Sequence, residues 1–210
     1  MQLTVFGASG KVGGHLIDQA LNAGHTVTAV VRDPARLTPQ SHGTPKVVTA
    51  DVMDPQAIAE AVAGADSVIS ALGPSGRGPT AILVDSTRSI ITAMNDAGAT
   101  RLITISGSMV DDTGDGPVLH YIGKPITRRI LKNVCADMIG AEEAIHASRL
   151  DWTILRPPRL TDDAATGKWR TAFDRNVPHG FTIHRGDLAA CILNLINDPE
   201  TIHKHVFVAK

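Results

Sequence analysis

The chain has 210 residues, of which 43% are apolar and 20% are charged, a globular composition that excludes disordered and fibrous proteins. Twenty Lys and Arg against 21 Asp and Glu give a formal net charge of −1, so no general positive field favours nucleic acid or an anionic membrane as a partner. No apolar run approaches the roughly 18 residues of a membrane helix, and residues 1–6 lack the charged leader of a signal peptide. Two cysteines are too few for a disulfide framework. These features predict one cytoplasmic domain over residues 1–210.

A strand, a glycine-rich turn and a helix are predicted in that order at the start of the chain. Residues 3–6 are β-prone, and residues 7–10 read Gly-Ala-Ser-Gly. Apolar residues then recur at helical spacing, at Val12, Leu16, Ile17, Ala20 and Leu21. Gly24 ends this helix, and the β-branched residues 26–31 predict the next strand. The first βαβ unit therefore occupies about residues 2–31.

The same alternation continues through the rest of the chain. Further strands are predicted at 46–50, 66–71, 101–105, 152–156 and 205–209, and helices at 55–62, about 80–97, about 125–148 and 187–196. Parallel neighbours need long, right-handed crossovers, so the fold class is α/β, a single-domain Rossmann-type doubly wound parallel sheet flanked by helices. Ligands of such sheets bind at the carboxyl ends of the strands. The substrate side is therefore expected in the loops after strands four to six, about residues 73–80, 106–120 and 157–185, with 111–117 either a lid or a mobile surface loop.

Three glycines at the first turn indicate a phosphate-binding loop. Gly7-x-x-Gly10-x-x-Gly13 follows a strand and opens a helix, although its spacing departs from G-x-G-x-x-G. Glycine allows a sharp turn and a close approach of backbone to diphosphate, while the N–H groups from Ser9 to Val12 and the helix dipole attract the anion. The alternative is a glycine-rich turn without a ligand. The complete βαβ context favours dinucleotide binding.

The end of the second strand distinguishes the two nicotinamide cofactors. An acidic residue there binds the ribose 2′-hydroxyl of NAD(H), whereas arginine accommodates the 2′-phosphate of NADP(H). Arg32 comes first and Arg36 lies one helical turn later, so two guanidinium groups could bracket a phosphate. NADP(H) is therefore preferred. Asp33 keeps NAD(H) as an alternative cofactor. Both Arg32 and Asp33 could also be solvated turn residues.

Several blocks of sequence resemble the atypical short-chain dehydrogenase/reductases with an NAD(P)H-binding, NmrA-like domain, and within them the flavin reductases related to biliverdin-IXβ reductase. The resemblance covers nearly the whole chain and lies in residues 4–13, 31–37, 50–52, 62–69, 104–106 and 152–158. It implies a nicotinamide cofactor and a flat conjugated acceptor, such as a flavin, quinone or tetrapyrrole, bound as substrate. Flavin would then not be a permanent prosthetic group.

The resemblance also implies a cofactor set. Residues of the first turn would hold diphosphate, Arg32 and Arg36 the 2′-phosphate, and residues after the third, fourth and fifth strands the adenine, ribose and nicotinamide. The complete set is Gly7, Ser9, Gly10, Lys11, Val12, Gly13, Arg32, Arg36, Asp51, Val52, Ala71, Leu72, Gly73, Ser106 and Pro158.

The catalytic residues are harder to assign. Ser106 stands where the wider superfamily has its catalytic Ser, but Tyr121 and Lys124 are three residues apart and not four, so alcohol dehydrogenation is disfavoured. The related reductases carry two His where this chain has Arg159 and Met138. Arg159 could stabilise negative charge on a reduced flavin, or it could be an exposed loop residue. Ser106 and Arg159 are therefore the candidate catalytic residues.

Two other classes of function stay open. A non-enzymatic NAD(P) sensor, similar to the NmrA-like regulators, would also lack the Tyr–Lys pair. A sugar-nucleotide epimerase is disfavoured by the same absence. A monomer and a small homo-oligomer are both compatible with the sequence.

Two further clusters of residues are not assigned a function. The cations Lys124, Arg128, Arg129 and Lys132 are expected on a solvated helix face, with an acidic or phosphate partner as the alternative. His203 and His205 share one face of a strand but have no third ligand nearby in the sequence, so no metal is predicted.

Overall fold

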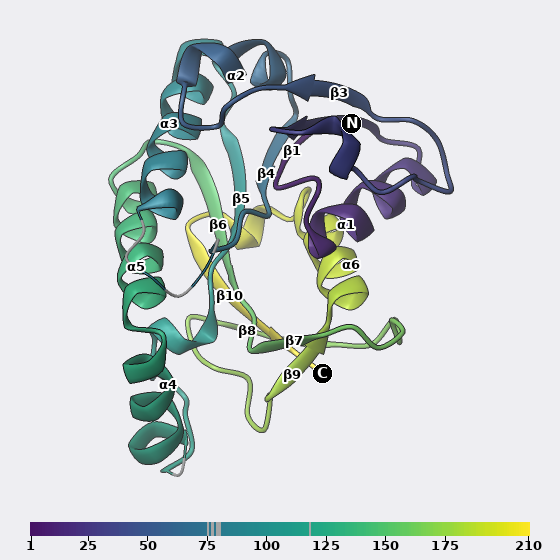
Figure 1. The fold of residues 1–210 in the computed structure, drawn as a ribbon. Coiled ribbons are helices and arrows are strands. Elements are labelled where there is room, and N and C mark those ends of the chain that lie inside the picture. Colours follow the sequence, from purple (N-terminus) through teal and green to yellow (C-terminus); the bar gives the residue numbers. More distant parts are fainter. Residues whose placement is uncertain (75, 77, 79–80, 118) are drawn as a thin grey trace.

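Eight strands form one sheet at the centre of the molecule (Figure 1). The structure is a computed structural model that describes residues 1–74, 76, 78, 81–117 and 119–210. The strand order is β3-β2-β1-β4-β5-β6-β10-β8, and all neighbours are parallel except β8, which is antiparallel to β10. The strands are β1 Gln2–Phe6, β2 Thr26–Val31, β3 Lys46–Thr49, β4 Ser67–Ser70, β5 Arg101–Ile105, β6 Asp151–Arg156, β8 Arg170–Phe173 and β10 Lys204–Ala209. The predicted doubly wound Rossmann-type α/β fold is confirmed.

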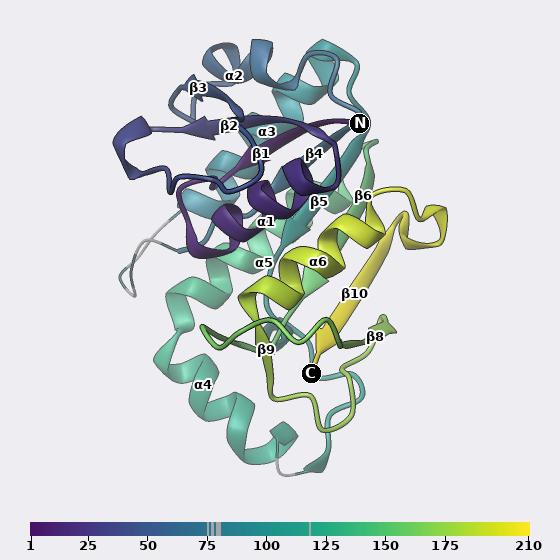
Figure 2. The same ribbon diagram turned by 90° about the vertical axis from the view of Figure 1, so that its right-hand side faces the viewer.

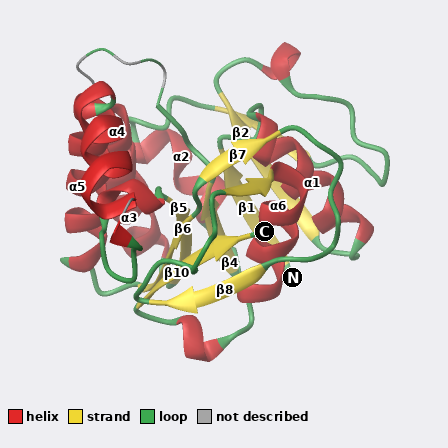
Figure 3. Ribbon diagram, turned by 90° about the horizontal axis from the view of Figure 1, so that it is seen from below, coloured by secondary structure: helices red, strands yellow, loops and turns green. Residues whose placement is uncertain are grey.

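Helices cover both faces of the sheet (Figure 3). On one face α1 (Lys11–Asn22) packs beside α6 (Arg185–Leu195), and their apolar residues share a core with Val5, Ile103 and Val206 of the strands (Figure 2). On the other face α2 (Pro55–Val62), α3 (Ile82–Ala97) and α5 (Lys132–His146) pack over Phe6 and Ile154. Fully buried parallel strands explain the near-continuous Val and Ile runs in the sequence. No helix among the described residues is both long enough and apolar enough to cross a bilayer.

The helix predicted over 125–148 is divided. A π-helical turn, Leu119–Gly123, precedes the predicted span, whose first part is α4 (Lys124–Ile130), and α5 follows after Leu131. Leu131 has φ −108° and ψ 28°, which is outside the helical region and turns the chain between the two helices. The start predicted for α3, at Thr80, lies outside the described residues, and α3 begins at Ile82.

Three short strands between Pro158 and α6, namely β7, β8 and β9, were not predicted. β7 (Arg159–Thr161) and β9 (Thr182–His184) pair in parallel as a separate two-stranded sheet. Each has three residues, too few to show a two-residue periodicity, and the partners are about 20 residues apart in sequence. β8 joins the main sheet beside β10, so the predicted loop 157–185 is an ordered side wall near the lower end of that sheet in Figure 1.

Close backbone contacts fix the glycine turn to the sheet. Gly7 has φ +75°, and a Cβ there would lie 2.6 Å from the carbonyl carbon and oxygen of Ala71 at the end of β4. A Cβ on Gly13 would lie 2.3 Å from the Gly7 oxygen. Gly10 has φ −81°, so Gly7 is the left-handed residue of the turn. Only glycine at positions 7 and 13 lets α1 approach β1 and β4 this closely.

We expect Gly13→Ala to lower the free energy of unfolding by about 1–3 kcal/mol, because the added Cβ overlaps the Gly7 carbonyl. Gly14→Ala is the matched control, since a Cβ there meets nothing within 4 Å and should stabilise α1 by roughly 0.5–1 kcal/mol. Urea denaturation of both variants measures the difference. Equal effects of the two substitutions would contradict the proposed close packing.

Candidate functional site

A cleft of about 720 Å³ lies along the carboxyl edge of the sheet. It spans β1 and β4, between which the strand order reverses, and this switch point is where doubly wound sheets bind ligands. Its walls come from eight separate segments, and the lining residues are Phe6, Gly7, Ser9, Gly10, Lys11, Val12, Val30, Val31, Arg32, Arg36, Ala50, Val52, Ala71, Leu72, Gly73, Pro74, Ile105, Ser106, Met138, Leu160 and Arg185.

The N-terminus of α1 opens into this cleft without a cap. Gly10 precedes the helix with no side-chain hydrogen bond, and the first turn has no acidic residue. The Gly10 N–H is bonded to the Gly7 oxygen at 2.9 Å, and the helical ladder begins with Gly14 N–H to the Gly10 oxygen. The N–H groups of Lys11, Val12 and Gly13 therefore have no intrahelical acceptor. By contrast, Asp54 caps α2 and Asp137 accepts from the first N–H groups of α3.

The predicted 2′-phosphate residues lie together at one end of the cleft. Arg32 and Arg36 are both exposed and line it, and no carboxylate of the described residues pairs with either. Asp33 does not line the cleft, because its carboxylate caps the short 3-10 helix Pro34–Arg36 through the Ala35 N–H at 3.0 Å. Asp33, which kept NAD(H) as an alternative cofactor in the sequence analysis, is therefore used in a local hydrogen bond.

Two cations that line the cleft, Lys11 and Arg185, share one acidic partner. Asp162, just after β7, accepts from Lys11 Nζ at 2.7 Å and from Arg185 at 2.5 Å. The Lys11 hydrogen bond, together with the charge of Arg185, holds the pKa of Asp162 below its usual range. The sequence analysis did not identify Asp162 or Arg185, because nothing local marks a residue that meets α1 from about 150 positions away.

Ser106 lies at the inner end of the cleft. Its side chain is 9% exposed, and its Oγ has no hydrogen-bond partner among the described residues. A recess of about 20 Å³, which also contains Glu142, continues inward from Ser106. A buried hydroxyl without a partner is rare in native proteins, so this Oγ is available to a ligand group in the cleft.

Several predicted residues do not line the cleft. Gly13 is behind the turn, the Asp51 carboxylate accepts from the Met53 N–H, and Pro158 is on the side wall. Arg159 is exposed on β7, and the next residue, Leu160, lines the cleft in its place. Successive side chains of a strand point to opposite sides, so Arg159 and Leu160 cannot both face the cleft.

The tyrosine and lysine of the sequence analysis are not in the cleft either. The Tyr121 side chain is 75% exposed on the π-helical turn. Lys124 is buried and pairs with Asp115 at 2.6 Å. Neither side chain lines the cleft, so they do not stand beside Ser106 as a Tyr–Lys pair.

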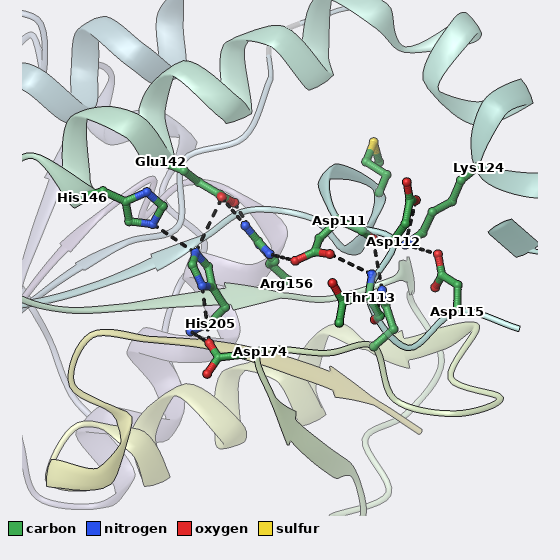
Figure 4. A network of polar contacts seen from close by, with 12 residues as sticks. Asp111, Asp112, Thr113, Asp115, Lys124, Glu142, His146, Arg156, Asp174 and His205 are labelled. Atoms are coloured by element: carbon green, nitrogen blue, oxygen red, sulfur yellow. Dashed lines mark hydrogen bonds and ion pairs between the residues drawn. The ribbon is translucent and has the colours of Figure 1, made fainter.

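The loop 111–117 is held down by ion pairs. Asp111 pairs with Arg156 at 2.6 Å and Asp115 with Lys124 (Figure 4). Asp112 pairs with Arg128 at 2.8 Å. The prediction that Lys124 and Arg128 lie on a solvated face is therefore wrong. Acidic residues of the loop neutralise Lys124 and Arg128. The periodicity of the helix sequence gives no sign of these ion pairs.

Arg156 connects this loop to the inner recess. Its guanidinium donates to both oxygens of Glu142, at 3.2 and 2.5 Å, as well as to Asp111. Partial burial disfavours the charged form of Asp111, but hydrogen bonds from Thr113 and the charge of Arg156 outweigh it and hold the pKa of Asp111 below its usual range. Glu142 and Arg156 are 5% and 7% exposed, so each charge depends on the other.

The cleft agrees with the comparison of the sequence with known families. The sequence model of the NAD(P)H-binding family matches residues 7–199, which include every lining residue except Phe6. The chain belongs to this family.

Relatives of this NAD(P)H-binding protein match it over nearly its full length. YwnB, an uncharacterized protein of Bacillus subtilis (strain 168), is 26% identical over 211 residues, which are 98% of this chain and 95% of YwnB. ChuY, described as an anaerobillin reductase from Escherichia coli O157:H7, is 28% identical with a TM-score of 0.79 over 100% of this chain and 97% of its own. A short-chain dehydrogenase/reductase from Veillonella parvula DSM 2008, solved with NADP, shares the fold with a TM-score of 0.84 at 18% identity, over 100% and 94% of the two chains.

We expect Arg156→Met to lower the free energy of unfolding by about 3–5 kcal/mol at neutral pH, because it leaves Glu142 as an unpaired buried charge. The double variant Arg156→Met/Glu142→Leu should recover most of this loss.

The stability of the parent protein should also depend on pH through Asp111. The pKa of Asp111 is lowered in the folded state, so the stabilisation by its ionised carboxylate is present at neutral pH and disappears as the pH falls through that lowered pKa.

Urea denaturation at several pH values measures both effects, with Arg149→Met as an exposed control expected within about 0.5 kcal/mol of the parent protein. A loss no larger than that of the control would show that the Arg156–Glu142 pair does not stabilise the fold.

Proposed function

We propose that this protein is an NADPH-dependent reductase that transfers hydride to a flat conjugated acceptor, with a flavin as the leading candidate substrate. The observation that carries the proposal is the continuity of the cleft, which runs from Arg32 and Arg36, past the uncapped N-terminus of α1, to the unpartnered Ser106 hydroxyl. NADPH presents its groups in this order: a 2′-phosphate that suits cations, a diphosphate that suits free N–H donors, and a nicotinamide that suits a buried polar contact.

The chain's own residues fit such a cofactor. The free N–H groups of Lys11 and Val12 suit a diphosphate, and Gly10, which lines the cleft beside them, has no side chain. Ala50 and Val52 provide an apolar surface for adenine beside Arg32. At the other end, Ile105, Ser106 and Met138 surround the space for nicotinamide and acceptor.

Hydride transfer to such an acceptor needs little acid–base catalysis by the side chains of the protein. NADPH supplies the hydride, and the residues around Ser106 stack donor against acceptor and exclude water. Ser106 Oγ can donate a hydrogen bond to the cofactor amide or to the acceptor. Arg159 would take part only if the side wall moved, because its side chain does not line the cleft. The reductase description of ChuY at 28% identity supports this class of reaction.

A non-enzymatic NAD(P) sensor is the second candidate. It is favoured by the position of Tyr121 and Lys124 away from the cleft, which leaves Ser106 as the hydroxyl at its inner end. The two candidates share cofactor binding and differ in turnover. Oxidation of NADPH in the presence of flavins, quinones and tetrapyrroles distinguishes them.

We predict that the protein binds NADPH more tightly than NADH and that Arg32→Ala removes this preference. Losing one charge-assisted contact costs about 1.5–3 kcal/mol, so NADPH binding should weaken roughly 10- to 150-fold while NADH binding stays nearly unchanged. Calorimetric titration of both cofactors measures this, with Lys46→Ala, an exposed cation outside the cleft, as control. Tighter binding of NADH by the parent protein would contradict the assignment of Arg32 and Arg36.

For turnover, we predict that Ser106→Ala slows NADPH oxidation with FMN, because the nicotinamide or acceptor loses a hydrogen bond inside a buried site. Tyr121→Phe should leave the rate unchanged, since that hydroxyl is exposed outside the cleft. Stopped-flow absorbance at the NADPH band measures both variants. A parent protein that binds NADPH but oxidises it with none of the flavins, quinones and tetrapyrroles would favour the sensor.

A further inference from the structure

Three side chains that can bind a metal ion converge where the end of α5 meets β10. Glu142 and His146 are one helical turn apart on α5, and His205 reaches them from β10 (Figure 4). One ligand atom from each lies within 4.8 Å of the other two. His203, which the sequence analysis paired with His205, is engaged elsewhere, with its Nε2 3.0 Å from the Leu150 oxygen.

The distances suit a small divalent cation. The Nε2 atoms of His146 and His205 are 3.0 Å apart, and His205 Nε2 is 3.8 Å from Glu142 Oε2. Two zinc–nitrogen bonds at the tetrahedral angle place their nitrogen atoms about 3.3 Å apart, so the imidazoles need to separate by only a few tenths of an ångström. A two-His, one-carboxylate set leaves a fourth position, and the exposure of His146 opens it to solvent.

A second carboxylate, that of Asp174, lies beside the other ring nitrogen of His205. Its Nδ1 lies 3.6 Å from Asp174 Oδ1, and Asp174 also accepts from the His205 backbone N–H at 3.2 Å. A proton on Nδ1 facing this carboxylate leaves the Nε2 lone pair directed at Glu142 and His146. Carboxylates fix metal-binding histidines in this way in known metal sites.

Charges near the three side chains do not oppose a cation. Arg156 uses one lone pair on each Glu142 oxygen, and a carboxylate has about four such sites. Its charge is shared with Asp111, while Asp174 pairs with Lys204 at 3.4 Å. The two imidazoles are therefore surrounded by three carboxylates and two cations, with one net negative charge. The carboxylates are those of Glu142, Asp111 and Asp174, and the cations are Arg156 and Lys204.

A second His–carboxylate group lacks these features. Asp112, Asp115 and His120 are also close together, but the Lys124 ammonium lies 2.6 Å from Asp115 and 3.8 Å from Asp112. A lysine in that position already neutralises the two carboxylates and occupies the place of a cation.

We propose that Glu142, His146 and His205 form a binding site for a divalent transition-metal ion, with Zn²⁺ the best match to its two imidazoles and one carboxylate. Nitrogen and oxygen ligands in this ratio select Zn²⁺, Cu²⁺ or Ni²⁺ over Mg²⁺ and Ca²⁺. Bound metal would join α5 to β10, two elements far apart in the chain. The proposal does not rest on cofactor binding in the cleft.

The test is titration of untagged, EDTA-dialysed protein with ZnCl₂ by calorimetry and with CoCl₂ by visible absorption. One ion per chain should bind, and Co²⁺ should give the intense bands of a tetrahedral site. His146→Ala and His205→Ala should each weaken binding at least about 100-fold, and Asp174→Asn roughly 10- to 100-fold, the effect typical of a residue that orients a ligand. His15→Ala, an exposed helical His away from the site, should bind as the parent protein does.

Because His146 is exposed, its variant should fold, and NADPH titration of each variant checks that the cleft is intact. Saturable binding lost in both His variants and kept in His15→Ala supports the site. Either of two results would overturn it: no saturable Zn²⁺ binding below about 1 mM, the weak end of the affinity scale, or binding that survives in both His146→Ala and His205→Ala.

Discussion

The contact on which the rest of the site depends is the approach of the Gly7 turn to the end of β4. Gly7 has a positive φ, and a Cβ on it would lie only 2.6 Å from the backbone of Ala71, so only glycine fits there. Gly13 then lets α1 pack on the same turn. This arrangement brings the first N–H groups of α1 to the point where the strand order reverses. Asp54 and Asp137 cap α2 and α3, whereas the first N–H groups of α1 have no cap and border the cleft, which suits an anion.

The far side of the site is held by charge and not by backbone contacts. Arg156 joins Asp111 of the loop to Glu142 of α5, and three ion pairs fix residues that could otherwise move as a lid. Glu142 also borders the recess behind Ser106 and is one of the three side chains near His205. A single buried carboxylate therefore links the inner end of the cleft, the loop and the candidate metal site.

The parts of this structure that were predictable from sequence are those encoded by nearby residues. The β1–Gly7–α1 unit has a local period and a local turn signal, and Arg32 follows its strand directly. The position of Arg159 was not predictable, because it depends on which side of a three-residue strand faces inward. Asp162 and His146 were missed for a related reason: their partners, Lys11 and His205, are distant in the chain, and no periodicity marks such pairs.

A crystal structure of the protein with NADPH tests the central claim most directly, namely that the bare N-terminus of α1 organises a cofactor site along the carboxyl edge of the sheet. The account predicts diphosphate on the N–H groups of Lys11 and Val12, the 2′-phosphate between Arg32 and Arg36, and nicotinamide against Ser106. Diphosphate bound away from the Gly7–Gly13 turn, or nicotinamide at the Arg32 end of the cleft, would contradict it.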